Sequence, residues 1–504
     1  MKAPDLIDEQ SAELLGFPWL RTALAPVSAY GARRFAELRP YRLGEERAAQ
    51  DRAREVASIA GTLAPERVGA SRATLASLPD VAAVVARATM DDLLDDPDFF
   101  ELAQLCDGVE RLEGVANAAT RSVAATLAPG RREGGAFYLA DAFDPTLAGA
   151  RIALRDVQAE LDAARGRERA EAARALERDE IAGDEFIVMR ADLHGGPPPG
   201  VRVQREAATY LLCTLEYGAA SLAALERREA AVAAVAAAEE NVRRRLSSAM
   251  RESAGGLAAA NDALARLDET LAAVRFTQRY GCTAAEIVAE SALAIDQARF
   301  PPLEDELERA GRRFVPVTVQ LDAPAVLTGP NMGGKSVAMQ TCGFIALAAA
   351  FGLPVPAAHA RVALFDQIAW LGVGREERPT GLLSSFAAEL MALNGVLERR
   401  AQRPAIFVDE FARTTSPAEG IALAVALLER LREAGACGLA ATHLPGIAEA
   451  AGVRHFAVRS YVIAEVDGDE QVSGDAIALA ESLGMDERFV AAAYRALKGT
   501  TWTR

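Results

Sequence analysis

The chain has 504 residues, of which 51% are hydrophobic and 25% are charged. A chain of this length and composition is typical of a globular protein with two to four domains, which excludes a small peptide scaffold. Charged residues interrupt the alanine-rich runs before the roughly 18 apolar residues that a membrane helix needs, so no membrane span is predicted. The acidic N-terminus lacks a signal-peptide pattern, and we expect a cytoplasmic protein.

The net charge of −16 bears on the choice of partner. Proteins that grip phosphate backbones usually carry a basic excess, because counterion release drives that binding. The five cysteines are scattered without a C-x-x-C spacing, which argues against a zinc site and against a disulfide framework.

The first half of the chain is predicted to be helical. We expect an N-terminal segment over residues 1–50 and a helical core over residues 51–146, where apolar residues recur at spacings of three and four. Pro79-Asp80 predicts a helix boundary, and the Asp- and Pro-rich residues 95–98 predict another.

Two long stretches rich in Ala, Arg and Glu follow, at residues 147–180 and 205–253. Their alternating charges predict long helices, which we interpret as lever arms over residues 147–255. Short strands at 186–190 and 201–204 are expected to form a small β clamp tip between them. Gly255-Gly256 is expected to end the returning arm, with the helical core resuming over residues 256–300.

From residue 301 to 504 short apolar strands alternate with amphipathic helices, which predicts an α/β domain with a mainly parallel sheet. Residues 325–328, 405–408 and 438–442 are the candidate buried strands. Ligands bind at the carboxyl ends of such strands. The predicted fold class is therefore α plus α/β.

Residues 329–336 read GPNMGGKS and fit the phosphate-loop pattern G-x-x-x-x-G-K-[ST] between a predicted strand and a predicted helix. In such a loop the backbone N–H groups cradle phosphates at a helix N-terminus. Lys335 would reach the β and γ phosphates, and the Ser336 hydroxyl would coordinate Mg²⁺. The alternative is a glycine-rich turn that binds no phosphate.

Asp409 and Glu410 end a buried strand, where paired acids are costly unless they serve a cation or a reaction. Asp409 is expected to hold magnesium and Glu410 to polarise the attacking water. The alternative is that both acids cap a turn. His443 follows the third strand and is a candidate sensor of the γ-phosphate, with a structural role as its alternative.

Two further positions are ambiguous. Ser384 and Ser385 precede a predicted helix and are read as N-cap residues by their position alone. Phe314, upstream of the first strand, is read as a core aromatic. The remaining histidines, at 194, 359 and 455, receive no functional role.

The order TGPNMGGKS, SSFxxEL, VDEFART and ATH resembles the ATPase domain of the MutS mismatch-repair family. Residues 299–304 (RFPPLE) and 314–317 (FVPV) resemble upstream motifs of that domain, and residues 474–490 are similar to its closing helices, which help two subunits pair. The helical core, the arms and the β tip also look like the family's core and clamp domains.

This resemblance implies ATP and Mg²⁺ as cofactors and a homodimer with composite nucleotide sites. Glu410 and His443 would take the catalytic roles and Asp409 a metal role beside Ser336. Phe314 would stack on adenine, and Ser384 would reach the nucleotide of the other subunit. The phosphate-loop residues that would bind the nucleotide are Gly329, Pro330, Asn331, Met332, Gly333, Gly334, Lys335 and Ser336.

The departures from the family are equally informative. We expect the chain to lack the mismatch-reading domain, because the Phe-x-Glu triplets at 35–37 and 99–101 lie in unsuitable contexts, and to lack an appended nuclease. The family's DELGRGT run becomes DEFARTT at 409–415, and residues 151–250 hold 15 arginines against 17 acidic residues.

Two functions therefore remain open. One is an ATPase whose arms open and close on DNA. The other is a protein-remodelling ATPase, because residues 412–420 look like MutS-related proteins that reactivate cobalamin- and pyridoxal-phosphate-dependent aminomutases. A nucleotide-binding structural protein without hydrolysis is a third reading, which Glu410 disfavours.

Overall fold

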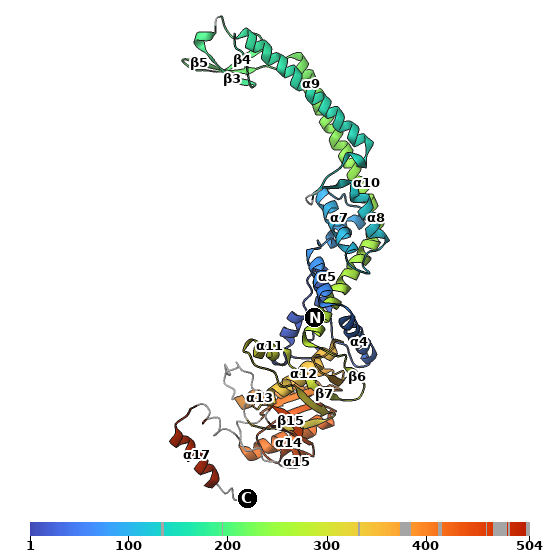
Figure 1. The fold of residues 1–504 in the computed structure, drawn as a ribbon, viewed down its shortest axis with the longest axis vertical. Coiled ribbons are helices and arrows are strands. Elements are labelled where there is room, and N and C mark those ends of the chain that lie inside the picture. The colour runs from blue at the N-terminus through green and yellow to red at the C-terminus, as the bar shows by residue number, and fades with distance from the viewer. Residues whose placement is uncertain are drawn as a thin grey trace. The chain divides into compact units, whose positions relative to one another are not determined.

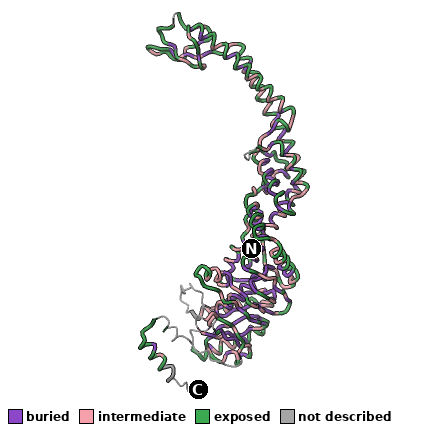
Figure 2. The backbone as a smooth tube through the Cα atoms, in the orientation of Figure 1, coloured by how far each residue is buried: buried purple, intermediate pink, exposed green. Residues whose placement is uncertain are grey.

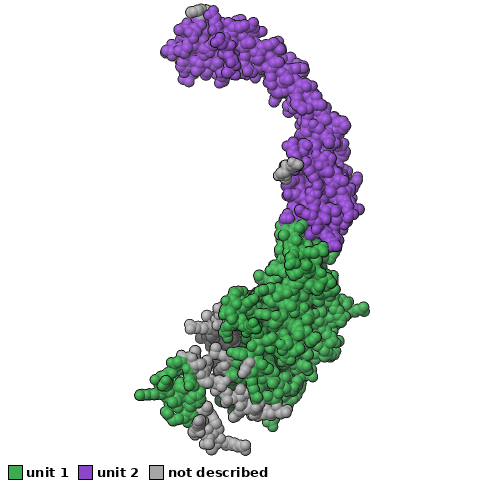
Figure 3. All heavy atoms as spheres, in the orientation of Figure 1, with its two compact units in different colours: residues 1–76, 264–504 green, residues 77–263 purple. Residues whose placement is uncertain are grey.

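The computed structural model of the chain describes residues 1–132, 136–193, 195–330, 333–372, 385–411, 416–459, 461–466, 481 and 484–499. The chain divides into two compact units, shown in Figure 3: unit 1 comprises residues 1–76 and 264–504, and unit 2 comprises residues 77–263. None of the helices in the described part of the chain has the length and apolar character needed to cross a membrane.

Unit 2 is largely helical (Figure 1). The predicted boundaries near Pro79 and Asp95 are confirmed, since one helix ends at Ser77 and the next two begin at Ala82 and Asp96. Asp95 caps the latter helix through a reciprocal pair of hydrogen bonds with Asp98. The helices and the small hairpin of this unit are α6 (Ala82–Thr89), α7 (Asp96–Glu110), α8 (Ala118–Leu127), β1 (Arg131–Arg132), β2 (Ala136–Phe137) and α9 (Pro145–Ala175).

Helix α10 (Ala219–Tyr280) returns beside α9 and is 62 residues long. Ion pairs join the two helices, including Arg151–Glu239 and Arg227–Glu160, each at 2.7 Å. Because α10 continues through Gly255 and Gly256, the predicted helix end at this pair is wrong. Gly256 is instead a contact point: a Cβ on it would lie 2.2 Å from the Cβ of Ala119, and Asn117 Nδ2 donates to its carbonyl at 2.8 Å.

The tip between α9 and α10 is an antiparallel sheet of three strands, in the order β3-β5-β4. Strands β3 (Glu185–Met189) and β4 (Val201–Glu206) correspond to the two predicted strands. They do not pair with each other, because β5 (Tyr210–Leu215) lies between them. Residues 210–215 were expected to be helical, and that prediction is wrong: alternate residues of β5 are buried against the end of α9.

The core of unit 1 is a six-stranded sheet in the order β11-β12-β13-β9-β14-β15, parallel except for the β14–β15 pair. The three predicted buried strands are confirmed as β9, β12 and β13. The bounds of the six strands are β9 (Pro324–Thr328), β11 (Gln367–Leu371), β12 (Pro404–Asp409), β13 (Cys437–Ala441), β14 (Arg454–Arg459) and β15 (Val462–Glu465).

A second, mixed sheet has the order β6-β10-β7-β8. Its strands are β6 (Glu286–Val288), β7 (Leu293–Ala298), β8 (Val317–Leu321) and β10 (His359–Ala363). The helical core expected over residues 256–300 is therefore helical only as far as Tyr280. Helix α12 (Lys335–Ala350) contacts strands of both sheets and is almost entirely buried. Burial on all sides explains why this helix is apolar all round. Figure 2 shows this concentration of buried residues in unit 1.

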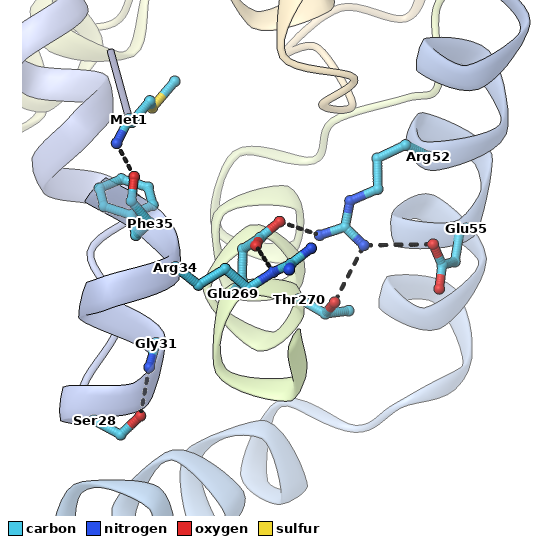
Figure 4. Close-up of polar contacts among 9 residues, drawn as sticks. All are labelled: Met1, Ser28, Gly31, Arg34, Phe35, Arg52, Glu55, Glu269 and Thr270. Carbon is cyan, nitrogen blue, oxygen red and sulfur yellow. Dashed lines mark hydrogen bonds and ion pairs between the residues drawn. The ribbon is translucent and has the colours of Figure 1, made fainter. Parts of the chain in front are cut away.

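The N-terminal segment is anchored within unit 1 on the end of α10 (Figure 4). Arg34 and Arg52 bind the Glu269 carboxylate at 2.6 and 3.2 Å. The neighbouring, fully buried Asp268 accepts hydrogen bonds from the Ser28 hydroxyl at 2.6 Å and from the Ser28 amide at 2.7 Å. These buried, charge-assisted bonds fix the segment on the helix.

The remaining helices of unit 1 follow the chain. At the N-terminal end they are α1 (Glu9–Leu14), α2 (Phe17–Ala23), α3 (Ala29–Glu37), α4 (Glu46–Thr62) and α5 (Pro65–Ser77). Around the sheets they are α11 (Pro301–Arg309), α13 (Ser385–Glu398), α14 (Pro417–Glu433), α15 (Ile447–Ala451) and α17 (Glu487–Gly499).

Candidate nucleotide site

The loop between β9 and α12 places a helix N-terminus at the carboxyl edge of the six-stranded sheet. Gly334 forms the N-cap of α12 with φ of 101°, a left-handed conformation that favours glycine. At Gly333 a Cβ would lie 2.9 Å from the carbonyl oxygen of Pro330, so the loop is too tight for a side chain there. Asn331 and Met332 lie outside the described residues.

The Lys335 side chain folds back over this loop and is only 6% exposed. Its Nζ donates to the carbonyl oxygens of Gly329 and Pro330, at 3.0 and 3.2 Å. Burial lowers the pKa of Lys335, while the carboxylates of Glu410 and Asp409 act in the opposite direction. The ammonium group of Lys335 therefore donates to carbonyl oxygens of its own loop, and an incoming anion would take their place.

Ser336 and Asp409 come from two different elements, α12 and β12, and meet at the sheet edge. The Ser336 hydroxyl donates to Asp409 Oδ2 at 2.8 Å. Burial raises the pKa of Asp409, and the hydrogen bond from Ser336 partly offsets this effect. A hydroxyl beside a carboxylate is an oxygen donor set that suits Mg²⁺.

The described residues include no group of three or more His, Cys, Asp or Glu that could hold a metal by itself. Mg²⁺ commonly takes one or two protein ligands and completes its shell with water and substrate phosphates. Ser336 and Asp409 therefore fit a magnesium ion that binds together with a nucleotide.

Glu410 begins the loop after β12 with φ of 53°, which is unusual for a residue with a side chain. Its amide donates to the carbonyl of Ala441 on the neighbouring β13 at 3.0 Å, which holds this conformation. His443 Nε2 lies 2.8 Å from Glu410 Oε1 and 3.2 Å from Lys335 Nζ. Since Nε2 either donates or accepts, only one of these two contacts is a hydrogen bond at a time.

A pocket of about 520 Å³ joins these residues to Phe314. Lys335, Ser336 and Glu410 line the pocket at the phosphate loop. Phe314 is half-buried in the wall of this pocket. The other residues that line it are Leu303, Leu307, Arg312, Arg313, Val315, Val317, Gly334, Val337, Ala338 and Tyr461.

Tyr461 is an aromatic wall residue that sequence reasoning missed. It lies in the turn between β14 and β15 with φ of 68°, and its ring would be 3.2 Å from a Cβ on Gly334. A tyrosine in a turn gives no functional signal by itself, so only the fold reveals this position. Ser384, predicted to reach across a dimer, lies outside the described residues.

Comparison with known proteins locates this site within one family. Residues 325–481 match the family model for MutS domain V. That range contains the phosphate loop, Asp409, Glu410 and His443, whereas unit 2 lies outside it.

Three relatives share the description Endonuclease MutS2. The protein of Pelotomaculum thermopropionicum is 34% identical over 202 residues, which are 39% of this chain and 25% of the relative. The protein of Symbiobacterium thermophilum is 34% identical over 202 residues, 39% of this chain and 24% of the relative. The protein of Clostridium botulinum (strain Loch Maree) is 29% identical over 267 residues, 52% of this chain and 33% of the relative. The matches therefore span about a quarter to a third of these relatives' length.

Proposed function

We propose, because residues 325–481 match the family model for MutS domain V, that the pocket in unit 1 binds and hydrolyses ATP with Mg²⁺. One observation carries this proposal: the Ser336 hydroxyl of the phosphate loop lies 2.8 Å from the strand-end carboxylate of Asp409. Residues 73 positions apart in the sequence meet where a nucleotide's metal would bind. A glycine-rich turn without a phosphate function gives no reason for this meeting.

Three side chains of the site would bind the metal ion and the phosphates. Ser336 and Asp409 would hold the magnesium ion, which supplies charge neutralisation at the phosphates. Lys335 would exchange the carbonyls of Gly329 and Pro330 for phosphate oxygens. The exchange replaces carbonyl dipoles with full negative charges beside the Lys335 ammonium group. These charges favour the protonated form of Lys335 and so oppose the effect of burial, which lowers its pKa.

Glu410 and His443 would serve the hydrolytic step. The Glu410 carboxylate would orient the attacking water and accept its proton. His443, 2.8 Å away, would hold that carboxylate in place through its Nε2–H group. The same nitrogen lies 3.2 Å from Lys335 Nζ, so the histidine is also placed to respond when Lys335 engages a phosphate.

The aromatic part of the pocket wall would receive the base. Phe314 and Tyr461 both line the pocket, and aromatic rings there can stack on adenine. Replacing Phe314 with Ala is expected to weaken ATP binding by about tenfold, roughly 1.4 kcal/mol, with little change in the rate of hydrolysis at saturation. An unchanged dissociation constant would remove Phe314 from the base site.

The central test uses two lysines. Lys335→Ala should abolish nucleotide binding and turnover, measured by titration with a fluorescent ATP analogue and by phosphate release. Lys2→Ala is the matched control, because the Lys2 side chain is exposed and far from the loop in the sequence. Nucleotide binding that survives in Lys335→Ala would refute the proposal.

We further propose that two copies form a homodimer with composite nucleotide sites, completed by Ser384 of the other copy. The support is the match to MutS domain V together with the SSFxxEL motif that Ser384 begins. ATP should then increase the dimer fraction in sedimentation, and Ser384→Ala should lower turnover while leaving nucleotide binding intact. Equal sedimentation with and without ATP would contradict the composite site.

Two classes of partner are candidates for binding to the arms of unit 2. Duplex DNA is supported by the match to MutS domain V. A protein client, such as the aminomutase suggested by residues 412–420, is favoured by charge: unit 2 holds 21 arginines and no lysine against 32 acidic residues, a net charge of −11. Duplex DNA titrated at about 50 and 200 mM salt separates them, since micromolar binding with a steep salt dependence requires a basic surface.

A further inference from the structure

The outer edge of strand β3 is open. Leu215 N donates to Asp184 O, and Arg190 N donates to Thr209 O, so the even-numbered residues of this strand point their backbone groups toward β5. The alternation of an antiparallel ladder then directs the N–H and C=O groups of Glu185, Ile187 and Met189 outward. Among the described residues, nothing accepts from or donates to these outward groups.

The two edges of the tip sheet differ in the way they are protected. Strand β4 carries Arg202, Arg205 and Glu206 and has a β-bulge between Val203 and Arg205. Charges and bulges are the usual devices that keep an edge from pairing with another chain. The middle of β3 reads FIVM and has neither a charge nor a bulge.

The face beside this open edge is apolar and exposed. Ile187 is 50% exposed, Met189 46% and Tyr210 36%. The opposite face is buried, with Val188 only 1% exposed in the cluster against the end of α9. The open edge therefore borders a buried core on one side and an apolar surface on the other.

We propose that β3 pairs antiparallel with β3 of a second copy of this chain, about a two-fold axis at Ile187. Charge complementarity favours this occupant and this register. With Ile187 opposite its own copy, Glu185 lies opposite Met189, and Asp184 of each copy lies opposite Arg190 of the other. Both end residues are half-exposed, although each already has an ion pair within its own chain, Asp184 with Arg165 and Arg190 with Glu206.

This register satisfies the open edge. Three pairs of outward-directed residues face each other across the axis, which gives about six backbone hydrogen bonds. The Ile187 side chains meet on the apolar face, and Phe186 of each copy meets Val188 of the other at the core side. The interface is isologous and therefore closes as a dimer instead of growing into a fibre.

The pairing is independent of the nucleotide chemistry, because every residue in it belongs to the tip of unit 2. A polyanion is a poor occupant for this edge, since β3 and the residue on each side of it hold two acidic residues and one arginine.

Cysteine cross-linking of the full-length protein tests the proposal. In the proposed register Ile187→Cys places two thiols opposite each other in a hydrogen-bonded pair, whose Cα atoms lie about 5.5 Å apart and whose Cβ spacing exceeds that of an unstrained disulfide. A short bis-maleimide spans this gap and should give a covalent dimer of twice 53.3 kDa on a denaturing gel. Gln204→Cys, exposed on the protected β4 edge, is the matched control and should cross-link at least about tenfold more slowly. The unmodified chain reports the background from the five native cysteines.

The register is tested by mixing two differently tagged variants, Glu185→Cys and Met189→Cys. Each alone should give little covalent dimer, while the mixture should give the heterodimer. The pairing would be overturned if Ile187→Cys and Gln204→Cys cross-linked equally, both with and without ATP. The edge would then be covered by another protein or only by solvent. Homodimers from Glu185→Cys alone would overturn the register. Circular dichroism checks that each variant is folded, and Lys335→Ala should leave the cross-link unchanged, which separates this outcome from failure of the ATPase proposal.

Discussion

Replacing Glu410 with Gln isolates the step that distinguishes an ATPase from a nucleotide-binding protein. The substitution keeps the shape of the side chain, the hydrogen bond from the backbone N–H of residue 410 to the Ala441 carbonyl at 3.0 Å, and an oxygen that can still accept from His443 at 2.8 Å. It removes the negative charge that would accept a proton from water. Loss of a general base costs about 10²–10⁴-fold in rate, equivalent to roughly 3–5 kcal/mol in activation free energy.

Single-turnover hydrolysis of radiolabelled ATP measures this step, and a fluorescent ATP analogue measures binding separately. We expect the hydrolysis rate of Glu410→Gln to fall at least about 100-fold while the dissociation constant changes less than about threefold. Glu449→Gln, an exposed Glu-to-Gln change on α15, is the control and should leave both quantities unchanged. Single-turnover hydrolysis within about tenfold of the unmodified rate would refute the assignment of Glu410 as the base.

Three further changes test the fold and the metal site. Gly255→Ala should stabilise α10 by about 0.5–1 kcal/mol, because nothing lies within 4 Å of the added Cβ. Gly256→Ala should instead destabilise unit 2, because its Cβ would meet Ala119. Thermal melts that rank the two variants the other way would contradict this packing. Asp268→Ala should lower the free energy of unfolding in urea by about 3 kcal/mol, since it leaves buried donors such as the Ser28 amide unpaired; a loss below about 1 kcal/mol would disprove the anchoring role. Burial raises the pKa of Asp409, so the stability that its protonated carboxyl contributes is lost as the pH rises through that pKa. The ionised carboxylate is the form that binds a metal, so Mg²⁺-dependent ATP affinity should fall as the pH drops through the same pKa. Asp409→Asn should flatten this pH dependence and stabilise the nucleotide-free protein, and an unchanged pH profile would exclude Asp409 as the metal ligand.

The parts of the fold that could be predicted are those set by local pattern. Strands β9, β12 and β13 are contiguous apolar segments that end in a polar residue or are followed directly by one, which is the pattern of parallel strands buried on both faces. The phosphate-loop spacing, with its lysine and serine, also lies within eight consecutive residues. These features can be recognised in the sequence because all the residues that define each of them are close together in the chain.

The features that escaped prediction depend on partners distant in the sequence. Gly256 reads as a helix end until Ala119 is seen against it, because a glycine that breaks a helix and one that admits a neighbour look alike in sequence. Residues 210–215 adjoin a long alanine-rich helix, and only burial against the end of α9 makes them a strand. Tyr461 reaches the pocket through the pairing of β14 with β15, which no local pattern specifies.

The positions and ion pairs of the charged residues in unit 2, and not only their sum, bear on the choice of partner. Its longest basic run, Arg243 to Arg245 on α10, is the natural candidate for a contact with phosphates. Each of the three arginines already has an acidic partner: Arg243 binds Asp96 at 2.9 Å, Arg245 binds Asp144 at 3.0 Å, and Arg244 binds Glu240. A phosphate backbone would have to displace these carboxylates against a net charge of −11, and it would release few counterions in doing so. The same arginines and acids present a mixed, hydrogen-bonding surface of the kind found at protein interfaces. Replacing Asp96, Glu240 and Asp144 with neutral residues together should therefore give tighter and more salt-sensitive DNA binding than the natural chain shows in the same titration.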